Sequence, residues 1–517
     1  MKRTRQHFEH SKRSLLQHSI IQWLTDGKSW AQAPQIVETH AALIFLVGDR
    51  AFKLKKAVNL GYLDFSTLES RRSTLERELR LNRRTAPDLY LRTLPITRTA
   101  ERKLALQGSG ETVEWLLEMR RFPTDALLSQ KAKLGQLNGA LAERLAIHIA
   151  QFHDREPLIS GYDWPKAVER IASENTADLR TQKHVFDTKL LEFVIAAREK
   201  MRRTCAAELQ RQSGDVRHCH GDLHLGNVFL DGDQPTLFDC IEFDEFYASI
   251  PPLYDLAFLL MDLRARGLPQ QANQTLSAWI INRDPTQWSQ DLQSLNVLPL
   301  YLILRAEIRA KTQARTPGGH QSALHYLEQA TSYAQPFVPR LLAIGGFSGT
   351  GKSSLARSLA WQCGGPIGAL HLSSDTIRKR MAGLPLTTHL PPDAYTREAS
   401  KLVYANLFDL AGSALRAGQS VILDAVFADK SERAAAKHLA EQHNVTFSGL
   451  WLEAPGEVLE SRINARRNDP SDADVTVLRK QSTYDLGTID WQKLDVSGTP
   501  SHAAQQALSL LGMTSKP

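Results

Sequence analysis

Hydrophobic and polar positions follow a strand-like pattern near the start of this chain of 517 residues and a helical pattern after it. Between Ile36 and Lys56, short β-type runs alternate with turn signals, of which Gly48-Asp49 is the clearest. This alternation predicts a small antiparallel sheet. The sequence also predicts a charged helix at residues 66–84, a strand at 113–122 and mostly helices from residue 140 onwards.

A second change of pattern comes near residue 336, where Pro336 and Pro339 interrupt regular structure because proline lacks the amide donor. An apolar run, a glycine-rich turn and a helix start follow, and later apolar runs at 420–423 and 448–452 each come after a helical pattern. Such alternation is typical of a parallel sheet wrapped by helices. We therefore predict a two-domain α/β protein, with an N-terminal extension at 1–30 and domains at 31–335 and 336–517.

Composition narrows the class of protein. Hydrophobic residues make up 42% of the chain and charged residues 23%, which argues for a globular protein and against disorder. The apolar runs at 41–47 and 256–261 are far shorter than the roughly 20 residues of a membrane-spanning helix, so we expect no membrane partner. The four cysteines form no C-x-x-C pair, which favours a reducing, cytoplasmic compartment.

The net charge of +7 is compatible with nucleic-acid binding, but anionic nucleotides account for it equally well. The basic residues are dispersed, without a stripe interleaved with aromatic residues, so we do not expect a nucleic-acid partner. The sequence leaves the oligomeric state open.

The strongest motif is a P-loop at residues 346–353, which match G-x-x-x-x-G-K-[ST] between a predicted strand and a predicted helix. Glycines let the backbone curl so that N–H groups point at phosphate oxygens. Lys352 would reach the β and γ phosphates, and the Ser353 hydroxyl would complete a Mg²⁺ shell. The predicted ATP-binding residues here are Gly346, Ser348, Gly349, Thr350, Gly351, Lys352, Ser353 and Ser354.

Polar residues after the P-loop indicate a kinase. Asp375 and Arg378 follow a probable second strand, where Asp375 would accept the proton of a substrate hydroxyl and Arg378 would hold a substrate or phosphate group. Asp424 ends the apolar run VILD and is a candidate Walker-B-type metal carboxylate. The alternative is that each aspartate only caps a helix.

A cluster of arginines follows. Arg462 and Arg466, with Arg467, precede the polar segment NDPSDAD, which suits a mobile lid that brings guanidinium groups onto the transferring phosphate. The alternative is a solvated helix face. Residues 340–495 resemble the P-loop small-molecule and polynucleotide kinases, which are AAA-family ATPase-like and include chloramphenicol-phosphotransferase-like and gluconate-kinase-like members.

A second cluster is HGDLHLGN at residues 220–227, followed by LFDCIEFD. This spacing brings together a catalytic loop, residues 220–227, and a metal loop, residues 237–244. Asp222 would orient the attacking hydroxyl and take its proton, while Asn227 and Asp239 would coordinate Mg²⁺. We expect His220 to brace the loop, because the neighbouring residues offer no zinc-like spacing.

These residues resemble the aminoglycoside phosphotransferase and choline kinase family, which implies a protein-kinase-like bilobal α+β fold over about residues 30–330. The resemblance implies that Lys53 contacts the α and β phosphates, with Glu78, or alternatively Glu76, as its ion-pair partner. It places the adenine-binding hinge at the backbone near Met119 and Arg120.

Two further features bear on this resemblance. It implies a structural role for Asp255 in PLYDLAF. The sequence departs from the family pattern at the turn near residues 39–42, which contains no glycine where a glycine-rich loop usually covers the phosphates.

Together the two regions resemble a bifunctional aminoglycoside phosphotransferase/ATP-binding protein that uses ATP and Mg²⁺ to phosphorylate small hydroxyl-bearing acceptors. The acceptor cannot be identified from the sequence, because the acceptor pocket varies within a fold. Two alternatives stay open. In one, only the P-loop domain is catalytic and the kinase-like domain is a sensor or scaffold; in the other, the chain is a nucleic-acid-associated ATPase.

Overall fold

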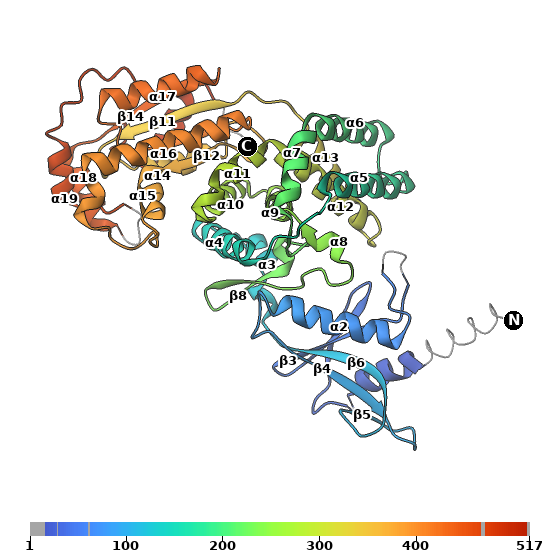
Figure 1. Ribbon diagram of the computed structural model, residues 1–517. Helices are drawn as coiled ribbons and strands as arrows, with labels where there is room; N and C mark the ends of the chain where they lie inside the picture. The colour runs from blue at the N-terminus through green and yellow to red at the C-terminus, as the bar shows by residue number, and fades with distance from the viewer. Residues whose placement is uncertain (1–15, 28, 60–62, 467–470, 514–517) are drawn as a thin grey trace. The chain divides into compact units, whose positions relative to one another are not determined.

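The computed structural model describes residues 16–27, 29–59, 63–466 and 471–513 (Figure 1). The chain forms two compact units, one from the described residues of Met1–Gln136 and Arg217–Ile250, the other from those of Leu137–Val216 and Pro251–Pro517. The second unit contains both a helical region and the P-loop sheet, so the predicted boundary at residue 336 stays a prediction. Within the described ranges, no helix is both long enough and apolar enough to span a membrane.

The first unit is a twisted antiparallel sheet with loops and short helices. Its elements are β1 (Gln35–Glu38), β2 (Ala42–Val47), β3 (Arg50–Lys55), α2 (Leu68–Asn82), β4 (Tyr90–Arg98), β5 (Leu104–Leu106), β6 (Glu111–Arg120), η1 (Thr124–Ala126), α3 (Leu128–Lys133), β7 (Arg217–His218), η3 (Leu225–Asn227), β8 (Val228–Asp231), β9 (Gln234–Leu237), α8 (Glu245–Ala248) and β10 (Ser249–Ile250).

The six-stranded sheet has the order β1-β2-β3-β6-β4-β5. Successive side chains of a strand point to opposite faces, and β3 shows the consequence. Phe52 and Leu54 pack into a buried cluster with Ile20 and Leu24 of the helix at residues 16–25. Lys53 and Lys55 share the other face, as their two-residue spacing predicts, and both reach Glu78 of α2.

The helical region of the second unit begins at residue 137, is interrupted in sequence by residues 217–250 of the first unit, and resumes at residue 251. Its elements are α4 (Gly139–Arg155), α5 (Trp164–Thr181), α6 (Thr188–Thr204), α7 (Ala206–Gln212), η2 (Ser213–Asp215), α9 (Pro252–Ala265), α10 (Pro269–Asn282), η4 (Pro285–Gln287), α11 (Trp288–Gln293), η5 (Ser294–Val297), α12 (Leu298–Ala314) and α13 (His320–Tyr333). Asp255 lies in α9, fully buried, and is bonded to His153 of α4 at 3.2 Å, in keeping with a structural role.

The remainder of the second unit is the P-loop region. Its elements are β11 (Arg340–Gly346), α14 (Lys352–Ala360), β12 (Leu370–Ser373), α15 (Ser374–Met381), η6 (Pro392–Tyr395), α16 (Arg397–Arg416), β13 (Val421–Asp424), α17 (Lys430–Gln442), β14 (Thr446–Glu453), α18 (Gly456–Ala465), α19 (Val475–Gln481), β15 (Gln492–Asp495) and α20 (Pro500–Leu510).

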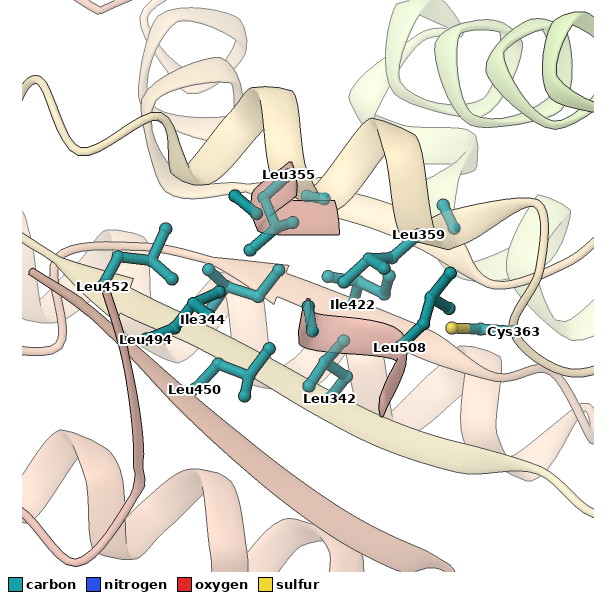
Figure 2. Packing of buried hydrophobic residues seen from close by; sticks show 14 of the residues in the cluster. Leu342, Ile344, Leu355, Leu359, Cys363, Ile422, Leu450, Leu452, Leu494 and Leu508 are labelled. Atoms are coloured by element: carbon teal, nitrogen blue, oxygen red, sulfur yellow. The ribbon is translucent and has the colours of Figure 1, made fainter. Parts of the chain in front are cut away.

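Its five strands pair in parallel in the order β12-β13-β11-β14-β15. On one face, Leu355 and Leu359 of α14 and Leu508 of α20 pack against Ile344 and Ile422 of the sheet (Figure 2). Helices α16 and α17 cover the opposite face (Figure 1). The predicted α/β/α parallel sheet is confirmed, and its carboxyl edge presents the P-loop.

Candidate functional site

The P-loop connects the end of β11 to the start of α14 through three glycines with positive φ. Gly346, Gly349 and Gly351 have φ of 143°, 88° and 84°, values that side-chain-bearing residues rarely adopt. A Cβ on Gly349 would also lie 2.8 Å from the carbonyl oxygen of Leu459. The predicted curl of the backbone is therefore present, and only glycine fits it without strain.

Side chains hold the loop in this shape. Thr350 Oγ1 donates to the carbonyl oxygen of Phe347 at 2.8 Å, and Lys352 Nζ donates to the same oxygen at 3.1 Å. The Ser348 amide donates to Gln481 Oε1 of α19 at 2.8 Å. Gln481 was not singled out in the sequence, because nothing in its local pattern links it to a loop 133 residues earlier.

Asp375 and Asp424 lie at the carboxyl ends of neighbouring strands, since Ser373 of β12 pairs with Asp424 of β13. Asp424 is buried and lies 3.1 Å from His371 Nε2. Burial alone would raise the pKa of Asp424, but His371, Lys352 and a hydrogen bond from Ser353 lower it below its ordinary value. The contact with Ser353 places the two predicted metal ligands of the P-loop region together.

The pKa of Asp375 is shifted in the opposite direction from that of Asp424. Burial raises the pKa of Asp375 above its ordinary value, and this rise outweighs the hydrogen bond from Ser471 and the attraction of Lys352. The N-cap of α15 is Ser373, and no side chain caps that helix, so Asp375 is not the N-cap that the alternative hypothesis required. A carboxylate with a raised pKa is suited to accept a proton.

These groups surround one cavity of about 630 Å³. Gly346 is the one predicted P-loop residue that does not line it. Twelve predicted residues line the cavity, namely Ser348, Gly349, Thr350, Gly351, Lys352, Ser353, Ser354, Asp375, Arg378, Asp424, Arg462 and Arg466.

The arginines differ in what they contact. Arg378 donates to the carbonyl oxygen of Ala394 and stacks over the Tyr395 ring at 4.9 Å. Arg462 Nη2 donates to the carbonyl oxygens of Val496 and Gly498 at 2.7 and 3.1 Å, so in this structure its guanidinium anchors backbone. Arg467 lies outside the described residues, as does part of the predicted lid, residues 468–470.

Asp472, within that polar segment, lies in the wall of the cavity. It accepts hydrogen bonds from Lys379 Nζ at 2.7 Å, the Tyr395 hydroxyl at 2.6 Å and the Leu390 amide at 2.9 Å. Burial would raise the pKa of Asp472, but the hydrogen bonds from Lys379 and Tyr395 lower it. Asp472 was not predicted, because its partners lie 77 to 93 residues earlier in the chain.

In the first unit, the loop of residues 220–227 brings its polar residues together. Asn227 Nδ2 donates to Asp222 Oδ2 at 2.9 Å and to the Asp222 carbonyl oxygen at 3.0 Å. His224 Nε2 lies 3.4 Å from the same carboxylate. His220 lies 2.9 Å from the Phe238 carbonyl oxygen, in keeping with a bracing role between this loop and the metal loop.

The lysines of β3 belong to a network of five charges, which we call the lysine network. Four of its members are buried, namely Lys53, Lys55, Glu78 and Glu242, and the fifth is the partly exposed Asp239. Lys53 Nζ lies 2.6 Å from Glu78 Oε1 and 2.8 Å from Asp239 Oδ1. Lys55 Nζ lies 2.7 Å from Glu78 Oε2 and 2.5 Å from Glu242 Oε1. Glu78, rather than the alternative Glu76, therefore pairs with Lys53.

Charge pairing governs how the lysine network ionises. Burial would lower the pKa of Lys53, but the charges of Asp239, Glu78 and Glu242 raise it well above the ordinary value. Burial would raise the pKa of Asp239, but Lys53 lowers it. The Phe238 amide donates to the Asn227 carbonyl oxygen at 3.0 Å, so the catalytic and metal loops lie next to each other, while the roles of Asp222, Asn227 and Asp239 stay predictions.

Two neutral side chains shape the metal loop. Asp239 has a φ of 62°, a left-handed conformation that is rare for a residue with a side chain. Its amide donates to the Tyr90 hydroxyl at 3.0 Å, and the next amide, of Cys240, donates to Asn82 Oδ1 at 2.8 Å. Neither Tyr90 nor Asn82 was singled out in the sequence, nor were Lys55 and Glu242 assigned a role there.

The predicted hinge is regular sheet in this structure. Met119 pairs with Ala51 on one side and Tyr90 on the other, and its side chain is buried. The Arg120 amide donates to the Leu89 carbonyl oxygen at 2.8 Å. That amide is therefore bonded to the turn before β4 in this structure, while the role of the backbone near Met119 and Arg120 stays a prediction.

The glycine-free turn before β2 is closed on itself. The Thr39 amide donates to the Ala42 carbonyl oxygen at 2.9 Å, and the Ala42 amide donates to Thr39 Oγ1 at 3.0 Å. Both amides therefore donate their hydrogen bonds within the turn. The departure from the family pattern noted in the sequence thus has a structural counterpart.

Both sites offer the oxygen donors that Mg²⁺ prefers. In the first unit these are carboxylate and amide oxygens of Asp222, Asn227 and Asp239, and in the P-loop region the hydroxyl of Ser353 and the carboxylate of Asp424. The chemistry of both donor sets therefore fits a magnesium ion.

Comparison with known proteins gives one family for each of the two candidate sites. Residues 70–289 match the Phosphotransferase enzyme family, and residues 341–484 match an AAA domain. Uncharacterized proteins of Mycobacterium tuberculosis and Mycobacterium bovis are 30% identical to this chain over 493 residues, which cover 91% of this chain and 94% of each relative. The chain belongs to the family of these mycobacterial proteins. The two resemblances inferred from the sequence are confirmed, and we call the two regions the kinase-like and P-loop regions.

Solved structures show more distant likenesses. A gluconokinase from Sinorhizobium meliloti is 20% identical, with a TM-score of 0.26, and the match covers 34% of this chain and 92% of that one. An ethanolamine kinase from Plasmodium vivax is 11% identical, with a TM-score of 0.38, and the match covers 61% of this chain and 86% of that one. Neither likeness supports a conclusion about the substrate of this chain.

Proposed function

We propose that this chain is an ATP- and Mg²⁺-dependent phosphotransferase with one phosphoryl-transfer site in each region. The observation that carries the proposal is the cavity in which Lys352, Ser353, Asp424 and Asp375 meet. A volume of about 630 Å³ lies within the range of about 300–1,000 Å³ that is usual for small-molecule sites.

In the P-loop region, the backbone amides and Lys352 would hold the phosphates, and Arg466 would approach the transferring group. Ser353 and Asp424 would hold a magnesium ion, which supplies neutralisation of phosphate charge when bound. Asp375 would accept the proton of the acceptor hydroxyl, which its raised pKa favours.

In the kinase-like region, Lys53 would contact phosphate and Glu78 would hold its ammonium group in place. Asp222 would orient and deprotonate the acceptor hydroxyl, while Asn227 and Asp239 would hold magnesium. We place the adenine side of this site at the end of β6, around Met119.

We further propose that the partners are a nucleotide and a small hydroxyl-bearing acceptor, not nucleic acid, and that the protein acts in the cytoplasm. The cavity supports the first point, because it suits a small molecule. The second rests on the sequence, whose four cysteines form no C-x-x-C pair and favour a reducing compartment.

The test uses full-length variants. ADP release is measured against sugars, nucleosides, amino alcohols and aminoglycosides for wild type, Lys352→Ala, Asp222→Ala and the double variant. We expect each single variant to lower turnover of a different acceptor by about 10²- to 10³-fold, the usual effect of losing one group that stabilises the transition state. The exposed Lys401→Ala and Asp233→Ala serve as matched controls. ATP consumption that survives in the double variant would refute both sites.

A second candidate is that the kinase-like region binds a nucleotide without transferring its phosphate. The closed turn at residues 39–42 favours it, because both amides there are engaged within the turn. On this hypothesis, Asp222→Ala leaves every phosphotransfer activity intact while Lys352→Ala removes it. Nucleotide binding to the Lys352→Ala protein, measured by calorimetry, would then remain.

A further inference from the structure

The predicted metal carboxylate of the P-loop region, Asp424, has a histidine beside it on the neighbouring strand. Strands β12 and β13 pair in parallel, with Ser373 opposite Asp424, and His371 stands two residues before Ser373. Residues two positions apart on a strand point to the same face of the sheet, as do paired residues of adjacent strands. His371 and Asp424 therefore share a face, and His371 Nε2 lies 3.1 Å from Asp424 Oδ2.

The direction of this hydrogen bond follows from the chemistry of the two groups. A carboxylate that binds a metal ion is ionised, and an ionised carboxylate can only accept hydrogen bonds. His371 Nε2 therefore carries a hydrogen and donates it to Asp424, whether the ring as a whole is neutral or charged. The bond restricts the rotation of the carboxylate group, because it ties one oxygen to a ring on the adjacent strand.

The carboxylate of Asp424 has lone pairs left for a metal ion. It accepts one hydrogen bond from His371 and one from the Ser353 hydroxyl. Its two oxygens offer about four lone-pair positions, so about two are left for a metal ion or a metal-bound water. The Ser353 hydroxyl donates its one hydrogen and keeps oxygen lone pairs for the same metal. The two donors thus determine which way the free lone pairs of Asp424 point.

His371 is a neighbour of this carboxylate but lies outside the space proposed for the nucleotide. Both side chains are largely buried, with 12% of His371 and 3% of Asp424 exposed. Asp424 lines the cavity of about 630 Å³, whereas His371 does not line it. His371 instead lines a cavity of about 90 Å³, and Ser353 and Asp375 line both cavities. We therefore expect His371 to act through Asp424 and not by touching the nucleotide.

Helix α10 of the helical region fixes the backbone that carries His371. The His371 amide donates to Ser277 Oγ of α10 at 3.3 Å. Asn273 Nδ2, on a buried side chain of the same helix, donates to the carbonyl oxygens of Ile367 and Ala369 at 2.9 and 2.8 Å. Because β12 stands at one end of the sheet order, these bonds from α10 add to its pairing with β13. Both the helical region and the sheet therefore set the position of His371.

We propose that His371 is a positioning residue of the P-loop site, which turns the Asp424 carboxylate towards magnesium, and that α10 holds His371 in place for this task. The inference rests on the phosphotransferase function proposed above. Hydrogen-bonded partners of metal-binding groups typically contribute about 10- to 100-fold in metal affinity or activity. The helical region then supports a metal site that the P-loop motif alone does not specify.

The alternative is a purely structural role. A buried carboxylate needs hydrogen-bond donors whether or not it binds a metal, because burial removes it from water. On that alternative, replacing His371 lowers the thermal midpoint but leaves the metal affinity of the folded protein unchanged. A test must therefore measure metal binding itself, alongside stability.

The experiment uses Mn²⁺ as the probe of the magnesium site in the full-length protein with ADP. Free Mn²⁺ is counted by electron paramagnetic resonance, and Asp424→Ala defines the Mn²⁺ that is bound elsewhere. We expect His371→Leu to weaken Mn²⁺ binding about 10- to 100-fold. His371→Gln should restore most of the loss, because its amide nitrogen donates from about the same reach.

Two further variants complete the set. Ser277→Ala removes the acceptor of the His371 amide and should weaken Mn²⁺ binding by up to about tenfold, the size of one neutral hydrogen bond. His325→Leu is the matched control, since His325 bonds the Ala265 carbonyl oxygen at 2.8 Å and lines neither cavity. Its Mn²⁺ affinity should equal that of wild type.

The outcomes separate this inference from the function on which it rests. If Asp424→Ala binds Mn²⁺ as tightly as wild type, the proposed P-loop metal site fails, and the role of His371 fails with it. If Asp424→Ala loses Mn²⁺ while His371→Leu keeps wild-type affinity, or if His371→Gln binds as weakly as His371→Leu, the positioning role is refuted and the phosphotransferase stands. Unchanged binding in Ser277→Ala would overturn the part assigned to α10.

Discussion

The two candidate sites hold their phosphate-binding lysines in different ways. Lys53 is bonded to two carboxylates, one of which, Asp239, is 186 residues away in the chain. Lys352 is bonded to the carbonyl oxygen of Phe347, five residues away. The first lysine is thus positioned by side-chain charges gathered from distant segments, and the second by a local backbone loop.

The difference determines what each site depends on. A local glycine-rich loop keeps its shape through backbone conformation, so single glycines matter most there. A buried charge network keeps its shape only while every charge has a partner, because an unpaired charge in the interior is costly. The following predictions test whether the two sites fail in these two different ways.

The largest effect is expected at the centre of the lysine network. Glu78→Gln keeps the volume of the side chain but removes the charge that binds both Lys53 and Lys55, at a position that is fully buried. We expect the free energy of unfolding to fall by about 3–5 kcal/mol, as when one partner of a buried ion pair is removed. Urea denaturation measures this.

Glu76 provides the matched control, since it lies on the same helix and pairs with Arg72. Both of these side chains are nearly half exposed, so Glu76→Gln should change the free energy of unfolding by no more than about 0.5 kcal/mol. Equal effects of the two substitutions would show that the network does not act as a unit.

The next effect concerns the local loop. Gly349→Ala adds a methyl group 2.8 Å from the Leu459 carbonyl oxygen at a positive φ, whereas Gly351→Ala meets no atom within 4 Å and carries only the unfavourable φ. We expect about 1–2 kcal/mol of destabilisation for Gly351→Ala, and clearly more for Gly349→Ala. Thermal unfolding compares the two, and nucleotide affinity should follow the same order.

The sequence alone was sufficient to predict the P-loop, but it was not sufficient to predict the lysine network. Residues 346–353 are contiguous, so their spacing contains the whole motif. Lys53 and Glu78 were found only through the resemblance to a known family, and the pairing of Lys55 with Glu242 spans 187 residues that no local pattern connects.

Other features depend on tertiary packing, which also limits what a sequence shows. Asp472 binds Lys379 and His371 binds Asp424, and in both pairs the partners are far apart in the chain. The backbone near Met119 and Arg120 was expected near adenine, and the sequence did not show that the Arg120 amide bonds to Leu89 in the turn before β4. The α/β/α sheet, in contrast, was predicted correctly because its apolar runs and helices alternate along the chain.

A comparable effect is expected where the helix at residues 16–25 supports the lysine-bearing strand. Gln17 Oε1 accepts from the Ala57 amide at 2.6 Å, and Gln17 Nε2 donates to the Lys55 carbonyl oxygen at 3.0 Å. We expect Gln17→Ala to cost about 1–3 kcal/mol, because it leaves buried groups without partners. Gln22→Ala, at an exposed position of the same helix, is the control, and a similar loss in both would show that the loss does not come from the hydrogen bonds of Gln17, since alanine is itself the strongest helix former.

The last prediction separates the two carboxylates of the P-loop site by pH. Burial raises the pKa of Asp375, while His371, Lys352 and Ser353 hold the pKa of Asp424 below its ordinary value. A proton acceptor works only when deprotonated, so kcat/KM of the Lys352-dependent reaction should fall as the pH drops through a pKa above the ordinary aspartate value of about 3.9. Asp424 stays ionised over that range and should not contribute to the fall. A pH–rate profile that is flat down to about pH 4 would mean that Asp375 does not take the proton, and the site would then stabilise its transition state through the loop alone.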